Sequence, residues 1–191
     1  MRFGIKNMAA TIAFRAGRTS EYTWVNENKG IWEGSIRLDY WMGFFEMKEP
    51  MALNIGGDIL TAEINKIHET GYNYLIDNQI VILNSILLAL YDIYPKLQSN
   101  YDYDEDEKTI YMPDIVNKED FKILLKPRGI FILDIVKNDM PYIGFEFLCT
   151  WDDEHGCGVM THNSKIVKIG GAETSFLSWI AEKDLNNSNS T

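Results

Sequence analysis

Apolar and polar residues alternate along the first third of the chain, which is the pattern of a β-strand with one buried face. Over residues 32–40 the apolar side chains occupy even positions and the polar ones odd positions. Residues 51–55 repeat this alternation, and the "GGD" at 56–58 indicates a turn. The next segment, 59–69, fits either a third strand or a helix. The pattern predicts antiparallel strands with one solvent-exposed face.

The segment from Asn78 to about Tyr94 predicts the strongest helix of the chain. Its apolar residues recur at spacings of three and four and cover most of the circumference, so we expect it in the middle of the core. Asp77 is expected to cap the first turn, and Pro95 to end or kink the helix. The apolar run 80–94 is shorter than the roughly 20 residues of a membrane span, so we expect no membrane association.

Two segments of different character follow the helix. Residues 98–108, "QSNYDYDEDEK", are predicted to form a solvated acidic loop. Residues 117–126 predict a second, short helix that ends at Pro127 and Gly129. The chain from Gly129 onward then has the pattern of β-structure.

Four short apolar segments, at 129–136, 142–151, 158–162 and 165–169, are separated by turn sequences and predict a four-strand meander. The fold class we predict is α+β: a twisted, mainly antiparallel sheet of N-terminal strands plus this meander, packed on one long central helix.

The chain is expected to form a single domain over residues 30–180. Residues 1–29 are predicted as an N-terminal extension or edge strand, because their apolar run is short for a signal peptide and no clear cleavage site follows. Residues 175–184 allow a closing helix, and 181–191 are expected to be a disordered tail.

The net charge of −10 over 191 residues narrows the class of partner. No basic stripe is available to bind phosphates, so we expect no nucleic-acid binding. The acids are concentrated, with eight acids and one base between Glu69 and Glu107, and this charge favours a basic protein partner. The candidate surface for that partner consists of Asp102, Asp104, Glu105, Asp106 and Glu107.

The remaining composition is typical of a cytoplasmic binding protein. Only two cysteines, Cys149 and Cys157, are present, and they indicate thiols in a reducing compartment rather than a disulfide framework. Five tryptophans and ten tyrosines are more than a core of this size needs, and these residues are common at protein interfaces.

The stretch "CTWDDEHGCGV", from Cys149 to Val159, carries the candidate chemistry. As a β-turn over 153–156 it would place Asp152 opposite Cys157, with Gly156 supplying the left-handed backbone conformation. The candidate binding residues of this motif are Trp151, Asp152, Asp153, Glu154, His155, Gly156 and Gly158.

Two other interpretations of this stretch are open. A metal site would need Cys149, His155, Cys157 and His162, whose spacing is unlike the close ligand pairs of structural zinc sites. An acid–base pair of Glu154 and His155 would need a water-poor cleft, and no known catalytic signature accompanies it. We therefore predict no catalytic residue, no metal and no cofactor. The alternative is a metal-binding protein or hydrolase-like enzyme that uses Glu154, His155 and Cys157.

The motif C-x-W-x-x-E-H-G-x-G-V, from Cys149 to Val159, resembles that of a bacterial family of unknown function. The central helix is also similar, so the resemblance covers residues 30–175. Such domains are similar to immunity proteins of polymorphic toxin systems, which implies a small acidic cytoplasmic protein that neutralises a toxin partner. The resemblance implies no catalytic residue for this chain. Cys157 departs from the aliphatic residue usual there, which weakens the metal interpretation.

From the motif we also derive a local hypothesis, in which Glu154 accepts hydrogen bonds from turn amides or from His155 and thereby fixes the hairpin. The function we expect is that of a non-catalytic cytoplasmic binding protein with a basic protein partner such as a toxin.

Overall fold

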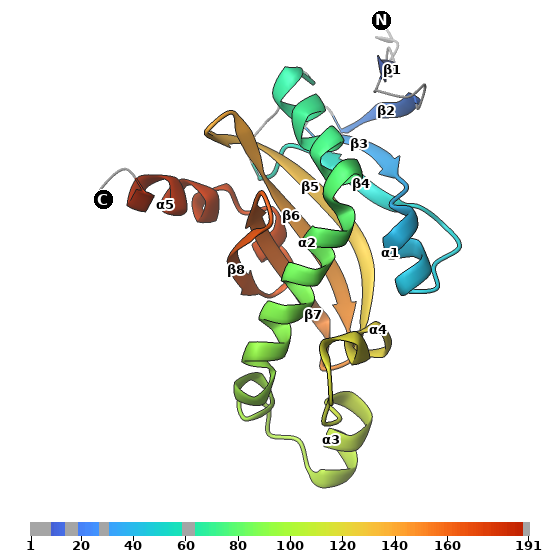
Figure 1. The fold of residues 1–191 in the computed structure, drawn as a ribbon, viewed down its shortest axis with the longest axis vertical. Coiled ribbons are helices and arrows are strands. Elements are labelled where there is room, and N and C mark those ends of the chain that lie inside the picture. The colour runs from blue at the N-terminus through green and yellow to red at the C-terminus, as the bar shows by residue number, and fades with distance from the viewer. Residues whose placement is uncertain (1–8, 14–18, 27–30, 59–63, 189–191) are drawn as a thin grey trace, which may run out of the picture.

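The computed structural model describes residues 9–13, 19–26, 31–58 and 64–188, and Figure 1 shows their arrangement. The strands lie in one sheet in chain order, and all neighbouring pairs are antiparallel except β4 and β5. The strands are β1 (Ala9–Ala13), β2 (Thr19–Asn26), β3 (Ile31–Ile36), β4 (Met51–Ile55), β5 (Leu125–Lys137), β6 (Met140–Cys149), β7 (Asp152–His162) and β8 (Lys165–Gly170).

A long helix, α2, lies across the sheet formed by β3–β8 (Figure 1). The helices are α1 (Asp39–Phe44), α2 (Lys66–Gln98), α3 (Glu105–Tyr111), α4 (Phe121–Leu124) and α5 (Ser178–Ser188), with 3-10 turns η1 (Lys118–Asp120) and η2 (Ala172–Ser175). Because β4 and β5 are parallel, a crossover must connect them, and α2 with the short helices after it makes that crossover. The predicted α+β fold is confirmed.

Helix α2 is longer at both ends than the sequence predicts. Its N-cap is Asn65, whose side-chain oxygen accepts a hydrogen bond from the Ile67 amide at 2.9 Å, while His68 Nδ1 accepts one from the Asn65 amide at 3.1 Å. Asp77 lies inside the helix, so the prediction that it caps the first turn is wrong. A first-turn cap needs free amides, and those lie twelve residues earlier than expected.

Pro95 also lies inside α2; of its two predicted effects, an end or a kink of the helix near Tyr94, the end is wrong. Proline removes one amide donor, but the helix continues to Gln98 because this turn is anchored by packing. Tyr94 is buried and its hydroxyl donates to the Pro113 carbonyl at 3.1 Å. By length and composition α2 could cross a membrane, a test that the core helix of a globular domain also passes. Its buried residues pack on the sheet.

The N-terminal strand predictions hold in part. The alternation at 51–55 is β4, with its first, third and fifth residues buried. The strand predicted over 32–40 ends at Ile36, because α1 begins at Asp39 and places Leu38 and Trp41 in the core. Of the segment 59–69, residues 59–63 lie outside the described part of the chain, and the helical alternative is correct from Lys66.

The acidic segment contains a helix where we expected only a loop. Asp104 accepts a hydrogen bond from the Glu107 amide at 2.8 Å, and Glu107 accepts one from the Asp104 amide at 3.2 Å. This capping box starts α3. The helix predicted over 117–126 is correct only as η1 and α4. Its C-terminal end and the Pro127 and Gly129 stop signals lie in β5, where the pairing register shifts.

The C-terminal meander is confirmed as β5–β8. Alternate residues of β6 are buried against α2: Ile143, Phe145, Phe147 and Cys149, followed by Trp151. A smaller core lies under α5, where Leu133, Tyr142 and Met160 meet Ile180 and Ala181.

Helix α5 includes residues 181–188, which we had assigned to a disordered tail. Its docking explains the difference, since Tyr142 and Lys137 bind the Asp184 carboxylate at 2.7 and 2.8 Å. Residues 189–191 lie outside the described part. At the other end, β1 and β2 continue the sheet beyond β3.

Candidate functional site

The turn of the motif hairpin lies at Thr150 and Trp151, so the turn predicted over 153–156 is wrong. Cys149 pairs with Asp152 and Phe147 with Cys157, which leaves residues 153–156 outside the ladder as a bulge in β7. The predicted pairing of Asp152 with Cys157 is therefore also wrong.

The position of Trp151 explains the register. Its indole is buried and meets Tyr94 and Phe121 edge to face, with ring centroids 5.9 and 6.4 Å apart. Burial of so large an aromatic side chain contributes more than a regular turn would, so the chain bends at Trp151. Gly156 does have the expected positive φ of 65°, but within the bulge rather than at the hairpin tip.

Asp152 holds the bulge in place. Its Oδ1 accepts a hydrogen bond from the His155 amide at 2.9 Å and lies 3.0 Å from His155 Nδ1. The hydrogen bond to Asp152 and the charge of that carboxylate raise the pKa of His155. Burial favours a higher pKa for Asp152, but the bonds from His155 outweigh it and lower the pKa. Our local hypothesis gave this role to Glu154, which is exposed; the shorter Asp152 reaches the amide instead.

Two tyrosines connect the motif to the acidic segment. Tyr101 donates to Asp152 Oδ2 at 3.3 Å, and Tyr103 donates to the Trp151 carbonyl at 2.9 Å. Their rings are stacked with centroids 5.5 Å apart, and Tyr111 lies 5.5 Å from Tyr103. Burial, and then the charge of Asp152, raise the pKa of Tyr101 to about 12, so it stays a donor. The structure thus brings the two sequence-predicted site regions together.

Sequence reasoning missed these tyrosines, although a signal was present. In "YDYD", 101–104, aromatic and acidic residues alternate, which places Tyr101 and Tyr103 toward the hairpin and Asp102 and Asp104 toward solvent. The prediction of a solvated acidic loop with a partner surface uses only the acids of this segment.

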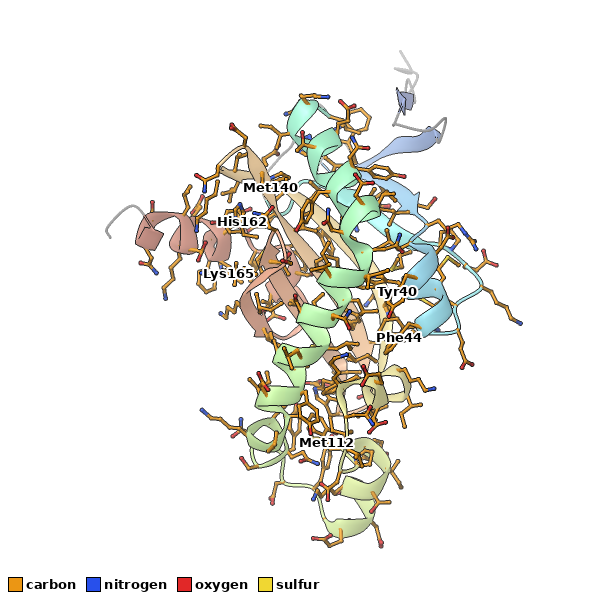
Figure 2. The ribbon with its side chains drawn as sticks, viewed as in Figure 1. Tyr40, Phe44, Met112, Met140, His162 and Lys165 are labelled. Atoms are coloured by element: carbon orange, nitrogen blue, oxygen red, sulfur yellow. The ribbon has the colours of Figure 1, made fainter. Side chains whose placement is uncertain are left out.

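The acids at Asp102 and Asp104–Glu107 are all exposed, and α3 buries none of its residues. The helix is instead held at its C-terminal end. Met112 is fully buried between α3 and the end of α2, as Figure 2 shows. Thr150 of the hairpin donates to the Tyr111 carbonyl at 2.6 Å. The acidic face is therefore presented on an ordered helix.

Exposed large apolar side chains concentrate on α2, α3 and the segment after them. Of the twelve in the part of the chain whose side chains are described, five belong to α2, two to α3 and one is Val116, which makes eight. We call these eight the α2–α3 surface: Ile80, Val81, Leu88, Tyr91, Ile93, Ile110, Tyr111 and Val116.

Four of the α2 residues share one face of the helix. At 100° per residue, Ile80, Val81, Leu88 and Tyr91 fall within an arc of roughly 100°. Val81 is 53% exposed and Leu88 52% exposed. A partner helix or strand could cover this stripe together with the exposed acids of α3.

The residues considered for metal binding do not converge. His155 has a side chain that is 70% exposed, whereas Cys157 is 3% exposed and faces the core. His162 bonds through Nε2 to the Lys137 carbonyl at 2.9 Å, at the far end of β7. Among the residues that the structure describes, no three His, Cys, Asp or Glu side chains are grouped so as to hold a metal ion.

The two residues of the acid–base interpretation do not lie in a water-poor cleft. Glu154 and His155 lie on the solvent side of the bulge. Cys149 and Cys157 line the opposite, apolar side, and burial raises the pKa of Cys149 to about 12 and also raises that of Cys157. Such thiols stay protonated and are poor nucleophiles. A cavity of about 190 Å³ between α2 and the hairpin reaches Cys157 but not Glu154 or His155.

Two glycines, Gly158 of the motif and Gly144 of β6, allow η2 to pack closely on the sheet. A Cβ at Gly158 would lie 2.4 Å from the Gly171 carbonyl oxygen and 2.7 Å from that of Ala172. A Cβ at Gly144 would overlap the backbone carbonyl of Ser175. These two positions form a flat area of the sheet on which η2 lies. Gly158 therefore belongs to the scaffold of the site rather than to its binding surface.

Comparison with known proteins identifies one similarity. A family model described as a domain of unknown function (DUF6985) matches residues 32–177. This range includes α2, α3 and the complete motif hairpin. No curated protein and no solved structure matches the chain.

Proposed function

The chain belongs to the DUF6985 family of domains of unknown function, and we propose that this member is a non-catalytic binding protein. Its protein partner contacts the α2–α3 surface. The single observation that supports this is the concentration of eight of twelve exposed large apolar side chains on α2, α3 and Val116. Four of them, Ile80, Val81, Leu88 and Tyr91, share one face of α2, and exposed apolar side chains gathered on one face of a folded domain are typical of interaction sites.

The charge of the partner follows from the acids beside this surface. Asp102, Asp104, Glu105, Asp106 and Glu107 are exposed on one ordered segment. Their field attracts a basic protein and accelerates its association, while the apolar stripe of α2 supplies most of the affinity. The partner we propose is a basic toxin of the same cytoplasm, which makes the chain its immunity protein.

The apolar stripe is tested by a double substitution, Val81→Asp with Leu88→Asp. Both side chains are about half exposed, so the fold should tolerate the change. Co-expression with a toxin encoded beside this gene should show protection by the wild-type chain and loss of protection by the variant. The matched control is Trp179→Asp, which changes a 47% exposed residue on α5 and should protect normally.

The proposal has two parts, binding of a protein partner and neutralisation of a toxin, and each is measured separately. Calorimetric titration of the purified toxin gives the affinity, and growth gives the neutralisation. Binding without protection would refute the immunity role and keep the binding role. Equal affinity for the wild-type chain and the stripe variant would refute the α2–α3 surface as the binding site.

The acids are tested by Glu105→Lys with Asp106→Lys, which spares the N-cap Asp104. At low ionic strength the association rate should fall by about tenfold, and the difference should shrink as salt is added. Glu33→Lys with Glu182→Lys makes the same change in net charge at exposed positions elsewhere. A rate that responds equally to both pairs would contradict a local role of α3.

A further inference from the structure

A basic groove lies on this acidic chain, separate from the α2–α3 surface. It has a volume of about 770 Å³ and lies between the loop that follows α1 and the start of β5. Its lining includes four bases, Lys48, Lys122, Lys126 and Arg128, against two acids, Glu46 and Glu49. A local excess of positive charge stands out where the whole chain carries −10.

Three of these bases are available to a ligand. Arg128 lies 3.3 Å from Glu146. Lys48, Lys122 and Lys126 are exposed and form no ion pair with any residue of the described part of the chain. Cations that line a groove without internal partners favour the binding of carboxylates or other anions.

The groove also carries exposed apolar side chains. Ile123 on α4 is 69% exposed and Leu148 on β6 is 41% exposed. Leu148 stands opposite Lys126 in the β5–β6 register, so apolar and basic groups are adjacent on one face of the sheet. A simple anion would use only the bases, whereas a peptide with an apolar side chain between acids would use both kinds of group.

The backbone beside the groove is the unpaired beginning of a strand. Along β5, pairing with β6 starts at Leu125, but pairing with β4 starts only at Gly129. Pro50 precedes β4 and lacks the amide needed to continue the ladder. Residues 125–128 therefore have a strand neighbour, β6, on one side only. The groove reaches Leu148 of β6 and extends over the unpaired side, where every residue except Pro127 has a backbone amide. An extended peptide is the natural occupant of such an edge.

We propose that this groove binds an extended acidic peptide segment of a protein partner, with an apolar residue between its carboxylates. Lys122 and Lys126 meet the carboxylates, and Ile123 and Leu148 meet the apolar side chain. Charge complementarity supplies the argument for this occupant, and the strand edge supplies its extended form. The groove and the α2–α3 surface share no residue, so this inference is independent of the proposed function.

The test starts from a display library of random twelve-residue peptides selected on the full wild-type chain. Enriched peptides should contain acids flanking an apolar residue. Labelled copies are then titrated with the wild-type chain and with Lys122→Glu plus Lys126→Glu, by fluorescence anisotropy. Affinity should fall at least about tenfold in this variant, because like charges then face each other.

Matched controls separate the groove from general electrostatics. Lys66→Glu with Lys183→Glu makes the same change in net charge at exposed positions elsewhere and should bind the peptides normally. The α3 variant Glu105→Lys with Asp106→Lys should also bind them normally, which keeps this result distinct from that of the proposed function.

Three outcomes would overturn the inference. Enriched peptides without acids, or peptides that bind the groove variant as well as the wild-type chain, would exclude the groove as an acidic-peptide site. Tighter groove-dependent binding of a labelled single-stranded oligonucleotide than of the best peptide would assign the site to nucleic acid instead. Circular dichroism of each variant confirms that the fold is retained, and a second variant, Leu148→Asp, tests the apolar contact if the lysine pair unfolds.

Discussion

Gly158→Ala is expected to destabilise the protein strongly, although it adds a single methyl group. The added Cβ would lie 2.4 Å from the carbonyl oxygen of Gly171 and 2.7 Å from that of Ala172. Both contacts are with backbone atoms, which cannot rotate away as a side chain can. Either η2 must lift from the sheet, or β7 must move away from it.

The magnitude follows from the size of the overlap. Overpacking a close-packed site costs about 1–3 kcal/mol, and two backbone contacts this short place Gly158→Ala near 3 kcal/mol. For a chain of this length each kcal/mol lowers the melting temperature by about 2–4 °C. The variant should therefore melt roughly 6–12 °C below the wild-type chain.

The matched control is Gly43→Ala, because a Cβ at Gly43 has no heavy atom within 4 Å. Gly43 lies in α1, where alanine is favoured over glycine by about 0.5–1 kcal/mol. The two Gly→Ala changes should thus have opposite signs in urea denaturation followed by tryptophan fluorescence. If Gly158→Ala lies within about 0.5 kcal/mol of the wild-type chain, η2 does not pack on β7 as described.

Two further predictions concern the motif. The pKa of His155, followed by NMR, should lie above that of a free histidine and return toward it in Asp152→Asn; no difference between the two proteins would disprove the contact. Since the folded pKa of His155 is raised, the stability from this contact is fully present below about pH 6.5, and it is lost as pH rises through the raised value. Cys149 and Cys157 should react with a thiol reagent at pH 8 only after denaturant is added, because burial raises both pKa values. Rapid modification of the native chain would contradict their burial.

The fold could be predicted from local patterns where those patterns coincide with burial. The alternation at 51–55 and in β6 depends on the two faces of a strand, so periodicity alone located both. The helix signal at Asn78–Tyr94 was equally local. The ends of that helix were not. Asn65 follows the rule for N-cap residues, whereas at Pro95 tertiary packing overrides the rule that proline ends a helix.

The candidate site was predictable in its parts and not in its assembly. The motif residues and the acids of α3 could be named from the sequence, whereas the hydrogen bonds of Tyr101 and Tyr103 that join the two regions connect residues 51 and 48 positions apart. Likewise, the basic groove collects Lys48 and Lys122 from segments that are far apart in the sequence. The composition gives only the net charge of the whole chain, which is −10 and hides this local excess of bases.

The amino-acid sequence by itself therefore determined the fold class, the meander, the core helix and the glycine-rich hairpin, since each depends on the chemistry of neighbouring residues. Only the tertiary structure decided the hairpin register, the partner of His155 and the separation of acidic and basic surfaces. The physical reason is that burial of Trp151 and the meeting of distant charges are set by three-dimensional packing, whose energies exceed local propensities.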